Sequence, residues 1–124
     1  MTHGPSVSSY ADCRLLWNNS RRRKLANHTY LLHSEAMDDY SIRLHRTNVV
    51  HYAKDGTVTL NSGGWRTVTT KDRINRFSPL RVWSDKGVWW VISSPVNGTV
   101  VRYEDGVSYN PNRTPAWLGQ GGAS

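Results

Sequence analysis

The 124-residue sequence contains a single cysteine, Cys13, which excludes an internal disulfide and a cysteine-based zinc site. No apolar run approaches the roughly 18 residues of a membrane-spanning helix, and the first twenty residues lack the basic and apolar regions of a signal peptide. We therefore expect no membrane association and a cytoplasmic location. Acidic residues are also few: 9 Asp and Glu stand against 16 Lys and Arg, a net charge of +7. This imbalance disfavours a two-carboxylate or two-metal active site.

Compact catalytic motifs are absent as well, including the Walker A loop, the HExxH zinc motif and the Gly-x-Ser-x-Gly elbow. Cys13 has no positioned base near it in the sequence. His45 and Thr47 form one half of the paired His-x-Thr elements of two-histidine phosphoesterases, and the second half is missing. We expect no cofactor and no enzyme activity; the alternative is a phosphoesterase or nuclease that uses His45 and Asp72.

The acidic and histidine side chains that remain as metal-ligand candidates are His33, Glu35, Asp38, Asp39 and His45. Their spacing matches no known metal motif, so we expect histidines that are exposed or hydrogen-bonded within the fold, and no metal.

The chain has the length of one domain, and its composition predicts three segments. Residues 1–20 show no sustained hydrophobic periodicity, which predicts a flexible N-terminal arm. Residues 21–109 predict a single β-rich globular domain. Residues 110–124, with two prolines and a Gly-Gly end, predict a C-terminal tail whose Trp117-Leu118 pair can dock on the domain.

Turn residues and hydrophobic alternation favour β-hairpins throughout the predicted domain. Asp55-Gly56 predicts a two-residue turn that places His51 opposite Leu60, and Asp105-Gly106 predicts another hairpin. Residues 27–35 and 40–48 predict two more strands, joined by a turn at residues 37–39.

Only the stretch TVTTKDRINRF is typical of a helix. It predicts a short helix near residues 70–77, with Thr69 or Thr70 as the N-cap, Asp72 in the first turn and a stop at Ser78-Pro79. The predicted fold is α+β and β-dominated, with about six to eight antiparallel strands and this one helix.

One region resembles a known group of proteins. Its shared elements are LANxTY, a His-x-Thr element, Asp-Gly and the run GGWRTVTTKDRIN, found here at residues 25–30, 45–47, 55–56 and 63–75. This pattern resembles small proteins encoded by tailed bacteriophages, and it covers about residues 25–77. The resemblance implies a phage origin and a role in the infected bacterial host; it carries over no catalytic residue.

Six tryptophans are many for this length. Trp65 and Trp90 are expected in the core. Asp85-Lys86-Gly87 predicts a three-residue hairpin loop that places Trp83 opposite Trp89, beside Arg81. An aromatic pair flanked by arginine is typical of surfaces that stack bases and contact phosphates. Cross-strand stabilisation of the hairpin and a protein interface are the alternatives.

The Gly63-Gly64 pair stands between a predicted strand and the predicted helix. One interpretation is an anion site built from Gly64, Arg66, Thr69, Thr70, Lys71 and Arg73. The alternative is a tight strand-to-helix corner in which Trp65 fills the core.

The basic composition leads to the functional prediction. We expect a small phage accessory protein that binds nucleic acid, either DNA or RNA, through its basic surface and exposed tryptophans. The candidate residues are Arg21, Arg22, Arg23, Lys24, Arg66, Lys71, Arg73, Arg76, Arg81, Trp83 and Trp89. The alternative partner is an acidic host or phage protein, as in an anti-defence inhibitor or a virion component. Open strand edges make a homo-oligomer compatible with the sequence.

Overall fold

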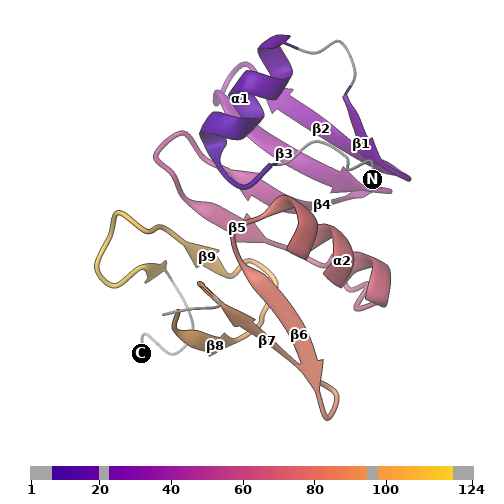
Figure 1. The fold of residues 1–124 in the computed structure, drawn as a ribbon, viewed down its shortest axis with the longest axis vertical. Helices are drawn as coiled ribbons and strands as arrows, with labels where there is room; N and C mark the ends of the chain where they lie inside the picture. Colours follow the sequence, from indigo (N-terminus) through magenta and orange to yellow (C-terminus); the bar gives the residue numbers. More distant parts are fainter. Residues whose placement is uncertain (1–6, 20–22, 95–97, 119–124) are drawn as a thin grey trace, which may run out of the picture.

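The protein folds into two antiparallel sheets and two helices in the computed structural model, which describes residues 7–19, 23–94 and 98–118 (Figure 1). The helices are α1 (Tyr10–Asn19) and α2 (Val68–Phe77). Neighbouring strands of the larger sheet are, in order, β1 (Lys24–Ala26), β2 (Thr29–Ser34), β3 (Asp39–Leu44), β4 (Thr47–Tyr52), β5 (Val58–Leu60), β9 (Ser108–Tyr109) and β10 (Trp117–Leu118). The smaller sheet is β6 (Arg81–Asp85), β7 (Val88–Ile92) and β8 (Val100–Arg102). The predicted β-dominated α+β class is confirmed.

The larger sheet has one buried face and one open face, because successive residues of a strand point to opposite sides. Leu31, Ile42, Val50 and Leu60 pair across four adjacent strands, and each is fully buried. Burying each of these side chains contributes about 1.5–3 kcal/mol to folding. Both helices pack on this face: α1 contacts β2 and β3, and α2 contacts β3 and β4.

Helix α1 occupies residues for which the sequence predicts an arm. Ser9 precedes the helix, and its hydroxyl accepts the backbone N–H of Asp12 at 3.1 Å, which caps the first turn. Cys13 is fully buried, and Tyr10 and Trp17 make edge contacts with Tyr40 of β3 at 5.3 and 6.4 Å between ring centroids. The hydrophobic stripe of α1 is thin, so periodicity alone does not reveal the helix.

Helix α2 starts slightly earlier than predicted. Thr67 is the N-cap, in place of Thr69 or Thr70, and its hydroxyl accepts the backbone N–H of Thr70 at 3.1 Å. The helix ends before Pro79, as predicted, because the residue before a proline is pushed out of the helical region.

Asn75 fastens α2 to the smaller sheet. Its side-chain oxygen accepts the backbone N–H of Val82 at 2.7 Å, and its nitrogen donates to the Val82 carbonyl at 2.9 Å. Strand β6 is an edge strand, so these backbone groups have no neighbouring strand to pair with. The amide of Asn75 takes the place of that strand.

The register predicted for the β4–β5 hairpin is wrong by one residue. Tyr52 pairs with Val58 and His51 with Thr59, so His51 does not face Leu60. Ala53 donates its backbone N–H to the carbonyl of Thr57, which closes a three-residue loop over 54–56. Within this loop only glycine takes a positive φ, of 98°, whereas the predicted type I′ turn requires two such residues.

The predicted register of the β6–β7 hairpin is also wrong, because this loop is one residue shorter than predicted. Lys86 and Gly87 both have positive φ, at 53° and 79°, and form a two-residue turn. Trp83 therefore lies opposite Trp90, and Trp89 moves to the other face of the sheet, where it is 5% exposed. A shift of one residue exchanges the faces of every side chain in the strand.

The hairpin predicted at Asp105-Gly106 does not form. Strand β8 belongs to the smaller sheet and β9 to the larger, so the chain crosses between sheets at this turn. The carboxylate of Asp105 accepts the backbone N–H of Ser62 and the hydroxyl of Tyr103, both at 2.8 Å. Gly106 donates its N–H to the Leu60 carbonyl at 2.7 Å. The turn therefore joins the two sheets.

The segment that follows β9 packs by its aromatic residues. Trp117 pairs with Tyr109 across β10 and β9, with ring centroids 4.9 Å apart. The side-chain amide of Asn110, which is buried, donates to Thr57 at 3.1 Å. The remaining residues, 119–124, lie outside the described residues.

Candidate functional site

The basic run at residues 21–24 is only partly described. Arg21 and Arg22 lie outside the described residues. The guanidinium carbon of Arg23 lies 3.9 Å from the ring centroid of Trp17, a cation–π contact with α1, and Lys24 is exposed on β1.

Arg66 and Lys71 gather around a buried ring. The guanidinium of Arg66 and the ammonium of Lys71 lie 5.4 and 5.5 Å from the ring centroid of Trp89. Lys71 also donates to the hydroxyl of Ser84 at 3.0 Å. Because Trp89 is buried beneath these contacts, it offers no open face to a base. These residues hold the start of α2 against the smaller sheet.

Arg73 and Arg76 make contacts with other side chains of the fold. The guanidinium of Arg73 donates to the hydroxyl of Thr29 at 2.8 Å and pairs with Asp72, and only 13% of its side chain is exposed. Arg76 lies 3.8 Å from the same Asp72 carboxylate, which follows the first turn of α2. The predicted anion site is therefore not assembled: Arg73 and Lys71 face other partners.

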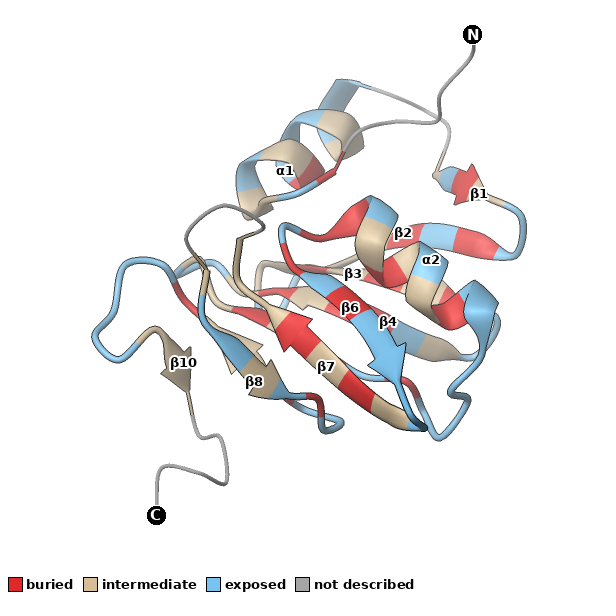
Figure 2. Cartoon of the chain, turned by 60° about the horizontal axis from the view of Figure 1, so that its bottom comes forward, coloured by how far each residue is buried: buried red, intermediate tan, exposed pale blue. Residues whose placement is uncertain are grey.

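Two tryptophans and two arginines share the outward side of the smaller sheet. Arg81 and Trp83 are two residues apart on β6 and therefore point to the same side. Trp83 pairs with Trp90 of β7, and Trp90 pairs with Arg102 of β8. We call these four residues the aromatic–arginine face. Trp83 is 37% exposed, and along β7 half-buried residues alternate with buried ones (Figure 2).

The geometry of this face follows from strand pairing. Side chains that are directly opposite on neighbouring antiparallel strands have Cβ atoms about 4.5–5.5 Å apart, and those two residues apart on one strand are separated by about 7 Å. Trp83 and Trp90 are therefore cross-strand neighbours, with Arg81 two residues from Trp83 along β6 and Arg102 opposite Trp90 on β8. Asp85 stands at the turn end of the same face. Sequence reasoning identified Arg81 and Trp83. It missed Trp90 because the predicted loop length set the wrong register, and it missed Arg102 because it placed that residue in a hairpin at Asp105-Gly106.

Two of the histidines each pair with one carboxylate. His33 and Asp38 lie 3.0 Å apart, and His51 and Asp39 lie 2.7 Å apart. The hydrogen bond with His33 lowers the pKa of the Asp38 carboxyl below its ordinary value. Within the described ranges no three His, Cys, Asp or Glu side chains are placed to hold a metal ion together.

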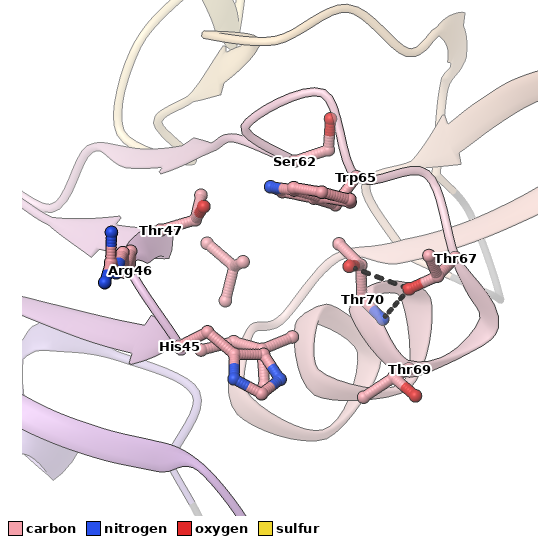
Figure 3. Close-up of a pocket in the computed structure, with 10 residues that line it drawn as sticks. His45, Arg46, Thr47, Ser62, Trp65, Thr67, Thr69 and Thr70 are labelled. Atoms are coloured by element: carbon pink, nitrogen blue, oxygen red, sulfur yellow. Dashed lines mark hydrogen bonds between the residues drawn. The ribbon is translucent and has the colours of Figure 1, made fainter.

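A pocket of about 500 Å³ lies between the β3–β4 turn and the start of α2 (Figure 3). His45 and Trp65 lie on opposite sides of it in this view, with Arg46 at the left and the threonines of α2 at the right. Trp65 is 69% exposed, so the prediction that it fills the core is wrong; Trp90 is likewise only half-buried. Thr69 and Thr70, from the predicted anion site, line this pocket.

The loop that carries Trp65 is fixed by backbone hydrogen bonds. Trp65 donates its N–H to the carbonyl of Ser62 at 3.0 Å, and Gly64 donates to the hydroxyl of Ser62 at 3.2 Å. Gly63 has a φ of 63°, and a Cβ there would lie 2.4 Å from the hydroxyl oxygen of Thr47. Only glycine allows the loop to approach the β4 strand so closely.

None of the helices in the described part of the chain is both long and apolar enough to cross a membrane. Comparison with curated proteins and with solved structures finds no match. A protein-family profile described as Kyanoviridae Gp96 protein matches residues 10–109, from the first residue of α1 to the last of β9. The chain therefore belongs to the Kyanoviridae Gp96 protein family, a family of tailed-phage proteins.

Proposed function

We propose that this phage protein binds single-stranded nucleic acid on the aromatic–arginine face, without catalysis, in the cytoplasm of the infected bacterium. One observation carries the proposal: Trp83 and Trp90 are paired across β6 and β7, with Arg81 and Arg102 on the same outward side.

The chemistry of unpaired bases fits this surface. Every base has a flat π-face that stacks on an indole, and stacking on one aromatic side chain contributes about 1–3 kcal/mol per base. In a duplex these faces are covered by neighbouring base pairs, so a flat aromatic surface favours single strands. The guanidinium groups of Arg81 and Arg102 supply positive charge for the phosphates on either side.

The rest of the chain supports the same partner electrostatically. The net charge of +7 attracts a polyanion from solution and raises its encounter rate, without selecting a sequence. Arg66, Lys71 and Arg73 add to this field although their contacts lie within the fold.

The test is a titration followed by tryptophan fluorescence, with single-stranded DNA, single-stranded RNA and duplex DNA of the same length. We expect saturable quenching by a single strand and weaker binding of the duplex. Trp83→Ala should weaken binding by roughly 5- to 150-fold, the equivalent of one lost stacking contact. Two phosphate contacts on a single strand predict that affinity falls about sevenfold between about 50 and 200 mM salt.

Tyr30→Ala is the matched control. Tyr30 is also an exposed aromatic residue near an arginine, with Arg43 5.9 Å from its ring centroid, but it lies on the open face of the larger sheet. This variant should bind like the wild type, and the oligonucleotide should be recovered intact. Absence of saturable binding at low salt, or equal losses in Trp83→Ala and Tyr30→Ala, would contradict the proposal.

An acidic host or phage protein is the second candidate for this surface. It is favoured by Val100, an apolar residue of β8 that is 47% exposed next to the arginines. If the titrations detect no nucleic acid binding, affinity capture from infected cells with the wild type and with Trp83→Ala tests this candidate.

A further inference from the structure

We propose that the pocket between the β3–β4 turn and α2 binds a nucleoside monophosphate, with the base against Trp65 and the phosphate at Arg46. This site is separate from the aromatic–arginine face: the two share no residue, and neither proposal depends on the other.

The size and walls of the pocket suit a small planar ligand. Its volume of about 500 Å³ falls within the roughly 300–1,000 Å³ typical of small-molecule sites. Leu44 and Val49 form an apolar floor, and both are almost fully buried. The indole of Trp65 bounds one side (Figure 3). A nucleobase that enters here covers apolar surface and stacks on one aromatic ring.

Trp65 is unusual because its side chain is highly exposed while the backbone of its loop is held in place. Its loop is anchored through Ser62, whose backbone N–H and hydroxyl both donate to Asp105 at 2.8 Å. A large apolar side chain left in water loses the stabilisation that burial would bring. A ligand that covers the indole recovers this stabilisation. Because the loop is already ordered, binding costs little conformational entropy.

The charge of the lining selects an anion. Arg46 stands at one side of the pocket, and none of the described residues that line it is Asp or Glu. Five lining residues carry hydroxyl groups: Thr47, Ser62, Thr67, Thr69 and Thr70. Those of Ser62, Thr67 and Thr70 are hydrogen-bonded within the fold, so Thr47 and Thr69 are the candidates for contacts with ribose hydroxyls or phosphate oxygens. A guanidinium pairs with phosphate through two parallel N–H bonds, so Arg46 is the phosphate contact.

His45 completes the wall opposite Trp65. It has a φ of 55°, which is costly for a residue other than glycine, and its ring stacks on His28 with centroids 4.6 Å apart. Its backbone N–H donates to the carbonyl of His28 at 2.9 Å. These contacts hold the imidazole in position, so a planar ring can be enclosed between His45 and Trp65.

The test is calorimetric titration of the full chain with adenosine, guanosine, cytidine and uridine monophosphates at low salt. We expect at least one to bind saturably with a Kd below about 1 mM, and adenosine alone and inorganic phosphate alone to bind at least about tenfold more weakly. Trp65→Ala and Arg46→Gln should each weaken binding about tenfold or more. His45→Asn, which tolerates a positive φ, should weaken it as well. Tyr30→Ala is the matched control: it is an exposed aromatic residue beside an arginine, lies outside the pocket and should retain full affinity.

Three results would overturn the proposal: no binding of any of the four nucleotides, unchanged affinity in Trp65→Ala, or equal losses in Trp65→Ala and Tyr30→Ala. The ligand chemistry has two sources, a free nucleotide or the phosphorylated end of a strand. Oligonucleotides with and without a terminal phosphate distinguish them, because only a strand-end site makes the phosphorylated form bind more tightly in a Trp65-dependent way. Loss of oligonucleotide binding in Trp83→Ala with nucleotide binding intact separates this site from the aromatic–arginine face.

Discussion

Replacing Gly63 with alanine is expected to destabilise the fold through two separate effects. The φ of 63° places an L-residue in the left-handed region, which costs about 1–2 kcal/mol. The new Cβ would also lie 2.4 Å from the hydroxyl oxygen and 2.8 Å from the methyl carbon of Thr47, and overpacking of this kind costs about 1–3 kcal/mol. The expected loss in the free energy of unfolding is therefore about 2–5 kcal/mol.

Gly64→Ala is the matched control for the backbone effect. Gly64 has a φ of 85°, but a Cβ there would meet no atom within 4 Å, so only the conformational cost of about 1–2 kcal/mol applies. Adding Thr47→Ala to Gly63→Ala removes the two clashing atoms. The double variant should recover the steric part, which appears as a coupling energy of about 1–3 kcal/mol in a double-mutant cycle.

The assay is urea denaturation followed by tryptophan fluorescence, with the slope of the transition compared among variants. Equal destabilisation by Gly63→Ala and Gly64→Ala, or a coupling energy near zero, would refute the steric reasoning. The same variant also tests the pocket, since the clash displaces the loop that carries Trp65.

Three further predictions follow from buried groups. Tyr52 donates to the Phe77 carbonyl at 2.5 Å, and burial raises the pKa of its phenol above the ordinary value, so the phenol ionises only on unfolding. Above about pH 10, the free energy of unfolding of the wild type should therefore fall by about 1.4 kcal/mol more per pH unit than that of Tyr52→Phe, measured in a pH series of denaturation curves. Asn75→Ala leaves two backbone groups of Val82 without partners and should lower the free energy of unfolding in urea by about 2–4 kcal/mol. Burial raises the pKa of the Cys13 thiol to about 12, so its alkylation at about pH 8, followed by mass spectrometry, should be limited by unfolding.

Each of these predictions has an internal check. If the free energies of unfolding of the wild type and Tyr52→Phe fall equally with pH above about 10, ionisation of Tyr52 is not the cause of the alkaline loss of stability. Asn75→Asp keeps an acceptor for the Val82 N–H but loses the donor to its carbonyl, and should fall between the wild type and Asn75→Ala. Rapid alkylation of Cys13 in the native protein, at the rate seen in urea, would show that the packing of α1 on the larger sheet does not bury the thiol.

The aromatic–arginine face was predicted only in part from the sequence. The sequence pointed to Arg81 and Trp83 as exposed binding residues, and both lie on the aromatic–arginine face. It paired Trp83 with Trp89, because Asp85-Lys86-Gly87 favours a three-residue loop when only glycine is assumed to take a positive φ. Lys86 takes one too, and the register shifts by one residue. Trp90 replaces Trp89 on the outward side for that reason.

The sequence singled out His45, Thr47, Thr69 and Thr70 in two separate patterns, but it did not show that they line one pocket. Its walls come from the β3–β4 turn, the Gly63-Gly64 loop and α2, which converge only in the folded chain. The prediction that Trp65 is buried followed the ordinary expectation for a large aromatic residue, and nothing in the local sequence indicates that its loop turns the ring outward.

Sequence patterns were enough to predict the β-dominated class, the strands on either side of residues 37–39, the helix that stops at Ser78-Pro79, and the basic charge. These depend on local preferences: side-chain alternation, the fixed φ of proline and the count of ionisable groups. Three features are visible only in the folded chain: the two hairpin registers, the crossing of the chain between sheets at Asp105-Gly106, and the packing of Tyr10–Asn19 on the larger sheet. In each case local energies are nearly balanced, and burial of apolar side chains against a distant part of the chain selects the outcome.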